Sequence, residues 1–296
     1  MKKFATIALV GAPNSGKSTL TNSLLGQKLS IVSPKVQTTR NVIKAIIVED
    51  QTQIILLDTP GVFIPRSDKI LERVIVKSAW QGIRSADFVC FIIDAARGLD
   101  RENARIIEEI KKNNINPTII INKIDIVKKS ILLDIINDLS KKGFSEILMV
   151  SAKTMDGVEN LKKLLIEKCP EGEWQYDEEN ITDAAMQSIA CEITREKLFL
   201  YLNQELPYSV TVKNDSYKID NDGKITIHQT ILVLKESQKA IIIGKKGSLI
   251  KKIGYESRRD FSTIAQAKVA LYLFVKVKKD WMNDSQNYEN KEIEKK

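Results

Sequence analysis

The chain has 296 residues, of which 43% are hydrophobic, which is enough for two packed domains and too many for a disordered chain. Its formal charge of +8 favours a polyanionic partner: nucleic acid, an anionic membrane or an acidic protein. Its apolar runs are far shorter than the about 20 residues that cross a bilayer, and its three cysteines and one histidine form no zinc or disulfide pattern, so we expect a soluble, cytoplasmic protein.

The first 170 residues alternate short apolar runs with amphipathic stretches. The runs are rich in β-branched residues and bounded by Gly, Pro, Asn or Asp, as buried strands are. This alternation predicts an α/β domain over residues 1–170, with a doubly wound, mostly parallel sheet. The expected strands are 4–10, 42–48, 53–57, 88–93, 118–121 and 147–150, and the expected helices are 17–25, 69–83, 101–111, 130–141 and 157–168.

The pattern changes after a polar, acidic stretch over 171–180, which contains Pro and Gly and predicts a linker. The order α-β-β-α-α-β that follows predicts a second, α+β domain over 181–282, and the mixed charges of 283–296 predict a polar tail. The elements expected there are a helix over 181–205, strands over 208–213 and 224–234, helices over 238–243 and 248–261, and a strand over 269–277.

A complete G-x-x-x-x-G-K-S motif, G-A-P-N-S-G-K-S, directly follows the first expected strand. Its glycines let backbone N–H groups surround a phosphate chain, and the next helix directs its positive end there. Lys17 can reach the β- and γ-phosphates, and the Ser18 hydroxyl can ligate Mg²⁺. The motif predicts the phosphate site of a P-loop NTPase. The expected contacts are Gly11, Ala12, Pro13, Asn14, Ser15, Gly16, Lys17, Ser18 and Thr19.

A second motif, Asp58-Thr59-Pro60-Gly61, closes the strand expected over 53–57. Asp58 should therefore face the same crevice and hold Mg²⁺ through water, while the Gly61 N–H senses the γ-phosphate. In the polar loop Gln37-Thr38-Thr39-Arg40, a threonine is expected to close on Mg²⁺ when the γ-phosphate is present, Thr39 first and Thr38 as the alternative. The expected catalytic residues are Lys17, Thr39, Asp58 and Gly61.

The motif Asn122-Lys123-Ile124-Asp125 indicates which base is bound. Asp125 can accept two hydrogen bonds from the guanine edge, and adenine would leave this carboxylate unpaired at a cost of about 2–3 kcal/mol. Lys123 would stack over the nucleotide. The sequence Ser151-Ala152-Lys153 would offer a backbone N–H to the guanine carbonyl. We therefore predict that the first domain binds GTP or GDP rather than ATP.

One position bears on the rate of hydrolysis. Ras-type GTPases place a Gln after the glycine of D-x-x-G to orient the attacking water. This chain has Val62 there, and its side chain cannot hydrogen-bond water. Intrinsic hydrolysis should be slow unless another group, a cation or a partner orients the water.

A G-K-K-G loop joins the helices expected over 238–243 and 248–261. Such a loop lets a nucleic-acid backbone approach closely, and the topology resembles that of a type II KH domain. From Lys239 to Arg259 there are seven basic residues and one acidic residue, a net +6. Ile253 and the run 241–243 are expected to form an apolar floor for unpaired bases. The expected RNA contacts are Gly244, Lys245, Lys246, Gly247, Lys251, Lys252, Arg258 and Arg259.

Taken together and in this order, the motifs resemble those of the Era family of bacterial GTPases, from about residue 4 to residue 281. The resemblance implies Mg²⁺-dependent, slow hydrolysis of GTP to GDP and nucleotide-dependent binding to the 3′ end of 16S ribosomal RNA during assembly of the 30S subunit. It also implies loose, peripheral contact with the anionic inner membrane and a potassium ion held by Asn14. We expect a monomer.

Two alternatives stay open at this point. A GTPase of tRNA modification shares P-N-x-G-K-S and the T-T-R loop, but it would carry different flanking domains and a terminal catalytic Cys, which this sequence lacks. A GTP-gated switch that binds another RNA is compatible with slow hydrolysis. Turnover in the presence of RNA and K⁺ separates a switch from an enzyme.

Overall fold

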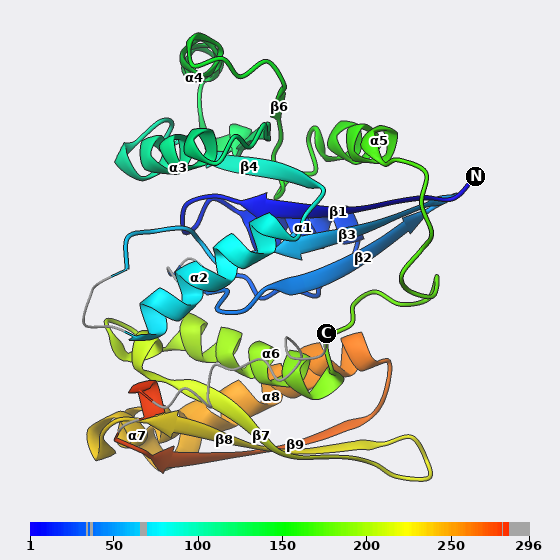
Figure 1. Cartoon of the computed structure of the whole chain (residues 1–296). Helices are drawn as coiled ribbons and strands as arrows, with labels where there is room; N and C mark the ends of the chain where they lie inside the picture. The colour runs from blue at the N-terminus through cyan, green and yellow to red at the C-terminus, as the bar shows by residue number, and fades with distance from the viewer. Residues whose placement is uncertain (34, 36–37, 66–69, 280, 284–296) are drawn as a thin grey trace. The chain divides into compact units, whose positions relative to one another are not determined.

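The computed structural model describes residues 1–33, 35, 38–65, 70–279 and 281–283 (Figure 1). The chain divides into two compact units, Met1–Pro65 with Ile75–Asp183, and Arg66–Val74 with Ala184–Lys296. Each unit has a hydrophobic core of its own. Among the described residues, no helix combines the length and the apolar content needed to cross a membrane.

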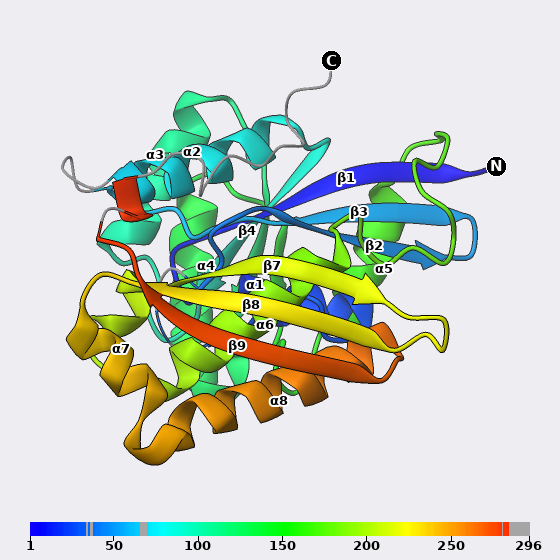
Figure 2. The ribbon, with the colours of Figure 1, turned by 90° about the horizontal axis from the view of Figure 1, so that it is seen from below.

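The first unit is built on a six-stranded sheet of order β2-β3-β1-β4-β5-β6. β2 is antiparallel to β3, and the other neighbouring strands are parallel. Strands β3 and β5 are buried along their whole length, because helices cover both faces of the sheet (Figure 2). The strands are β1 (Lys3–Val10), β2 (Ile43–Glu49), β3 (Thr52–Asp58), β4 (Phe88–Asp94), β5 (Thr118–Asn122) and β6 (Ile147–Met149).

In the part of the chain that the structure describes, five α-helices accompany this sheet. Apolar residues of α2, α3 and α4 join one core cluster with β1, β3 and β4, while α1 and α5 contact each other. The expected doubly wound, mostly parallel sheet is confirmed, with element ends that differ from the expected ones by at most one residue. The helices are α1 (Lys17–Leu25), α2 (Ile70–Arg84), α3 (Arg101–Lys112), α4 (Lys129–Lys141) and α5 (Val158–Lys168).

The stretch 170–183 packs against the first unit, although its polar composition predicts a linker over 171–180. The side-chain oxygen of Gln53, a fully buried residue of β3, accepts the N–H groups of Gln175 (2.8 Å) and Tyr176 (3.1 Å). The same side chain donates to the Tyr176 carbonyl at 2.8 Å, and the Ile181 carbonyl accepts the N–H of a residue in β2. These bonds tie the stretch to the sheet, so the break between the units follows Asp183.

The second unit holds a three-stranded sheet of order β7-β8-β9, in which β7 is antiparallel and β9 parallel to β8. The expected α-β-β-α-α-β order is confirmed, with a shorter first helix that begins at Met186 and not at residue 181. The elements are α6 (Met186–Tyr201), β7 (Thr211–Ile219), β8 (Ile225–Val233), α7 (Glu236–Ile243), α8 (Ser248–Ala265) and β9 (Val269–Val277).

Candidate functional site

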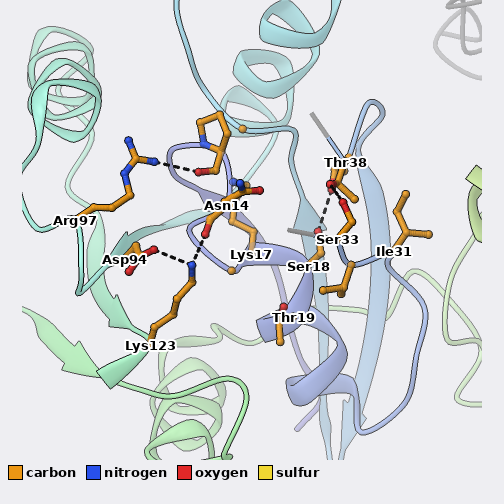
Figure 3. A pocket seen from close by; sticks show the side chains of 15 residues that line it. Asn14, Lys17, Ser18, Thr19, Ile31, Ser33, Thr38, Asp94, Arg97 and Lys123 are labelled. Atoms are coloured by element: carbon orange, nitrogen blue, oxygen red, sulfur yellow. Dashed lines mark hydrogen bonds and ion pairs between the residues drawn. The ribbon is translucent and has the colours of Figure 1, made fainter. Parts of the chain in front are cut away.

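The loop between β1 and α1 borders a cavity of about 530 Å³ at the carboxyl end of the parallel strands (Figure 3). This is the edge of an open α/β sheet at which ligands bind. The expected residues Pro13, Asn14, Gly16, Lys17, Ser18, Thr19, Thr38, Thr39, Gly61 and Lys123 line it, together with Ile31, Val32, Ser33, Asp94 and Arg97, which the motifs do not include.

Two glycines of the motifs stand where a side chain has no room. Gly16 has a φ of +96°, and a Cβ there would lie 2.2 Å from the side-chain nitrogen of Asn122. At Gly61 a Cβ would lie 2.8 Å from the Cα of Pro13. The P-loop therefore packs directly against both the N-K-I-D and the D-T-P-G motifs.

Lys17 is buried at the centre of the loop. Its Nζ donates to the carbonyls of Gly11 (3.1 Å) and Ala12 (3.0 Å). Burial lowers the pKa of Lys17 to about 8, although the nearby Asp58 raises it, and Lys123 lowers it further. Since the surroundings disfavour this buried charge, an anionic phosphate at the loop would stabilise the ammonium form.

The Asp58 carboxylate is fully buried, and neither of its oxygens has a hydrogen-bond partner of good geometry among the described residues. Burial raises the pKa of Asp58, which the nearby hydroxyls of Ser18 and Ser30 and the charge of Lys17 lower in part. The Ser18 and Thr39 hydroxyls lie 2.9 Å apart. A buried carboxylate without a partner, beside a pair of hydroxyls, is a donor set that suits Mg²⁺.

The two threonines of the Q-T-T-R loop differ in their contacts. Thr39 is buried against Ser18, whereas the Thr38 hydroxyl bonds to Ser33 (2.7 Å) and to the Lys35 carbonyl (2.6 Å). This geometry favours the first choice, Thr39, as the residue nearest the candidate magnesium site. Gln37 lies outside the described residues.

Two charged residues outside the motifs, Asp94 at the end of β4 and Arg97 three residues later, also line the cavity. The Lys123 Nζ donates to the Asn14 carbonyl and to the Asp94 carboxylate, each at 2.7 Å (Figure 3). Arg97 donates to the Pro13 carbonyl at 3.2 Å. These cations hold successive carbonyls of the P-loop. The sequence signal for Asp94 is a polar residue directly after the strand expected over 88–93, and no motif marks Arg97.

The base-selecting residues come together beside the cavity. The Asn122 side chain donates to the Ser15 carbonyl at 3.0 Å and accepts the Ala152 N–H at 3.1 Å, so it joins the P-loop to the S-A-K loop. The Ser151 hydroxyl donates to Asp125 at 2.7 Å, and Asp125 itself is exposed. The S-A-K loop thus orients the exposed carboxylate through Ser151.

Four further residues in or beside the motifs have defined surroundings, and the roles expected of them stay predictions. The Thr59 hydroxyl donates to the Leu9 carbonyl at 2.6 Å, and Pro60 is buried, so both attach the D-T-P-G loop to the sheet. Val62 is buried in the core, and its N–H donates to the Gly11 carbonyl at 3.1 Å. Lys153 is exposed.

The second unit has a groove of about 430 Å³ between α8 and the edge strand β9. The G-K-K-G loop lies at the start of α8, with positive φ at Gly244 (70°), Lys246 (52°) and Gly247 (76°). All six expected cations are exposed: Lys245, Lys246, Lys251, Lys252, Arg258 and Arg259. The groove is lined by Ile250, Lys251, Gly254, Tyr255, Arg258, Leu271, Tyr272 and Leu273.

The expected cations of α8 point in different directions around the helix, and only some of them line the groove. Lys251 and Arg258, seven residues apart, line the groove, whereas Lys252 lies 4.1 Å above the Tyr201 ring and Arg259 pairs with Asp260. The expectation that Ile253 forms the apolar floor is wrong, because Ile253 is fully buried in the core of this unit.

Comparison with known proteins agrees with this geometry. Residues 6–123 match the family described as 50S ribosome-binding GTPase, and residues 205–282 match the KH domain. GTPase Era of Bradyrhizobium sp. (strain ORS 278) is 45% identical over 289 residues, which cover 97% of this chain and 94% of that protein. The chain belongs to the GTPase Era family. It is a GTPase with a P-loop domain followed by a KH domain.

Two solved Era structures match almost the whole chain. Era in complex with MgGDPNP and nucleotides 1506–1542 of 16S ribosomal RNA has a TM-score of 0.92 at 36% identity, covering 97% of this chain and 99% of that one. Aquifex aeolicus Era carrying one substitution and bound to GDP and AlF4⁻ also has a TM-score of 0.92, at 37% identity, covering 97% and 98%.

Proposed function

We propose that this GTPase binds the 3′ end of 16S ribosomal RNA in a nucleotide-dependent way and assists assembly of the 30S subunit. Residues 1–170 handle the nucleotide, and residues 181–282 handle the RNA. The observation that carries the proposal is one chain holding both a guanine-nucleotide pocket and a cationic groove beside a G-K-K-G loop. The Era relative solved with MgGDPNP and 16S nucleotides supports it.

In the nucleotide site, the P-loop backbone and Lys17 hold the β- and γ-phosphates, and Asp125 reads the guanine edge. Ser18 and Thr39 ligate Mg²⁺, with Asp58 acting through water. The magnesium ion, when bound, neutralises charge on the phosphates. The supporting observation is the buried Asp58 carboxylate without a hydrogen-bond partner among the described residues, next to the Ser18–Thr39 pair.

Hydrolysis by this site alone is slow, since Val62 offers no polar group to the attacking water. We assign the Gly61 N–H, at the lining of the cavity, to the γ-phosphate. We propose a potassium ion at Asn14 as a further source of positive charge. Asn14 is exposed at the rim of the cavity with a φ of 63°, and its side chain carries an oxygen of the kind that binds hard cations.

In the second unit, Lys251 and Arg258 neutralise RNA phosphates along the groove, and the G-K-K-G loop admits the backbone. Lys245, Lys246, Lys252 and Arg259 add charge around it. We further propose a cytoplasmic monomer. The exposed cations of α8 also permit weak contact with anionic lipid headgroups.

Equilibrium binding of an RNA spanning 16S nucleotides 1506–1542 tests the proposal, with a scrambled RNA as the control. We expect sequence-selective binding that is tighter with a nonhydrolysable GTP analogue than with GDP. Equal, salt-sensitive binding of both RNAs in both nucleotide states would contradict the ribosomal assignment and leave a general polyanion clamp.

A further inference from the structure

The solvent face of the second sheet carries three stacked aromatic rings. The His228 ring lies 4.9 Å from the Tyr272 ring at an angle of 14°, and 6.4 Å from the Phe274 ring at 12°. We call these three residues the aromatic shelf. The two outer residues are exposed, Tyr272 at 51% and Phe274 at 55% of their full accessible surface. Three nearly parallel rings open to solvent form the kind of platform on which flat ligands stack.

The strand register explains why the rings gather. His228 is paired with Tyr272 in the parallel β8–β9 ladder, and Thr230 is paired with Phe274. Ile227 and Gln229, on either side of His228, are fully buried, so the alternation of the strand turns His228 to the solvent face. On the other side of β8, the Ser216 hydroxyl shares a hydrogen bond of 3.0 Å with the His228 Nδ1. The central ring is therefore held in place from both neighbouring strands.

The shelf is continuous with the groove. Tyr272 is at once a ring of the shelf and part of the lining of the cavity between α8 and β9. A chain that leaves the groove past Tyr272 therefore meets His228 and Phe274 next.

The charges around the shelf suit a polyanion. Lys276 lies two residues beyond Phe274 on the same face of β9, and Lys218 is paired with Thr226, two residues before His228. Both lysines are exposed, and Lys213 on β7 is partly exposed. Asp215, an exposed carboxylate of β7, is bonded to the Thr230 hydroxyl at 2.6 Å. Aromatic rings between lysines are typical of surfaces that bind single-stranded nucleic acid.

We propose that the aromatic shelf stacks unpaired RNA bases next to those held in the groove. The occupant is the same single strand, whose flat bases match the rings and whose phosphates match the lysines. The shelf should increase affinity for longer RNAs with unpaired bases, without preference for a particular base, because every base has a face that can stack. This inference rests on the proposed RNA-binding function and extends its footprint beyond the about four nucleotides of a KH groove.

The test uses the full chain and two oligoribonucleotides taken from 16S nucleotides 1506–1542, one of four nucleotides and one of eight. Phe274→Ala should weaken binding of the longer RNA about tenfold and leave binding of the shorter one unchanged. Phe274→Tyr should restore the affinity, since it keeps the ring. Ile219→Ala, at an equally exposed apolar residue of β7, is the matched control.

An eight-nucleotide RNA with abasic residues at the positions outside the groove gives a second measurement that does not depend on folding of a variant. The wild-type chain should bind it about as weakly as Phe274→Ala binds the intact RNA. Equal affinity of Phe274→Ala and wild type for the long RNA would overturn the shelf. The shelf would also be overturned if Phe274→Ala changed self-association, measured by sedimentation, and left RNA affinity intact. That result would assign the face to contact with a second copy of the chain. Failure of either RNA to bind the wild type would instead contradict the proposed function.

Discussion

The nucleotide cavity and the RNA groove differ in how much of each site is held in place before a ligand arrives. Around the cavity, Lys17, Lys123 and Arg97 each donate to a P-loop carbonyl, and Asn122 joins two loops. Along the groove, Lys251 and Arg258 are exposed at the surface of one helix. We therefore expect the first site to accept one ligand geometry and the second to neutralise the phosphates of a flexible chain.

The largest effect is expected at Lys17. Lys17→Ala removes a buried cation from the phosphate site, and charged hydrogen bonds are worth about 1.5–3 kcal/mol each. We expect at least a 100-fold loss of affinity for fluorescent GDP, measured by titration. Lys141→Ala, on the exposed end of α4, is the control. If Lys17→Ala bound GDP as tightly as the wild type does, the cavity would not be the phosphate site.

Asp125→Asn tests base selection. The amide cannot accept both hydrogen bonds from guanine, so GTP affinity should fall tens-fold while xanthosine triphosphate gains. Competition against labelled GDP measures both changes. Asp138→Asn, at an exposed carboxylate of α4, should alter neither. Unchanged selectivity at position 125 would remove the guanine assignment.

Arg97→Ala tests whether the P-loop depends on contacts outside its own motif. Losing the bond to the Pro13 carbonyl should speed GDP release about fivefold, the usual cost of about 1 kcal/mol for one hydrogen bond. RNA affinity should stay the same. Stopped-flow release of fluorescent GDP gives the rate. If release is as slow as in the wild type, the loop holds its shape without this contact.

Lys251→Ala and Lys252→Ala form a matched pair on adjacent residues of α8. Lys251 lines the groove, and its loss should weaken RNA binding several-fold and reduce the salt slope by about one. Lys252 lies over the Tyr201 ring, so its loss should have the smaller effect. Binding measured across a salt series compares them. Equal effects would mean that the groove does not set the path of the RNA.

Many of the residues expected at the nucleotide site line one cavity, because each motif couples a chemistry to a fixed place after a strand. Asp94 and Arg97 escape this reasoning, since they act on the P-loop from a distance in sequence. In the second unit, the cluster of basic residues predicts a cationic surface on α8. The rotation of each residue around the helix axis decides which side chains line the groove. Each residue turns about 100° around the helix, so Lys251 reaches the groove and Ile253 the core.

The boundary between the two units also could not be placed from local sequence alone. Composition predicts a linker over 171–180, because its side chains are polar and no apolar periodicity is present. The stretch is instead bound to the sheet through Gln53, a buried amide that sits inside an apolar strand and satisfies three backbone groups. Hydrogen bonds between residues so far apart in the sequence cannot be predicted from a local sequence pattern.

The central claim is that the nucleotide pocket and the RNA groove are coupled, and coupling between two ligands is reciprocal. The most direct test is the affinity of the full chain for a nonhydrolysable GTP analogue and for GDP, each with and without saturating RNA spanning 16S nucleotides 1506–1542. We predict that the RNA tightens binding of the analogue relative to GDP, by the same factor by which the analogue tightens the RNA. Identical nucleotide affinities with and without the RNA would contradict the account.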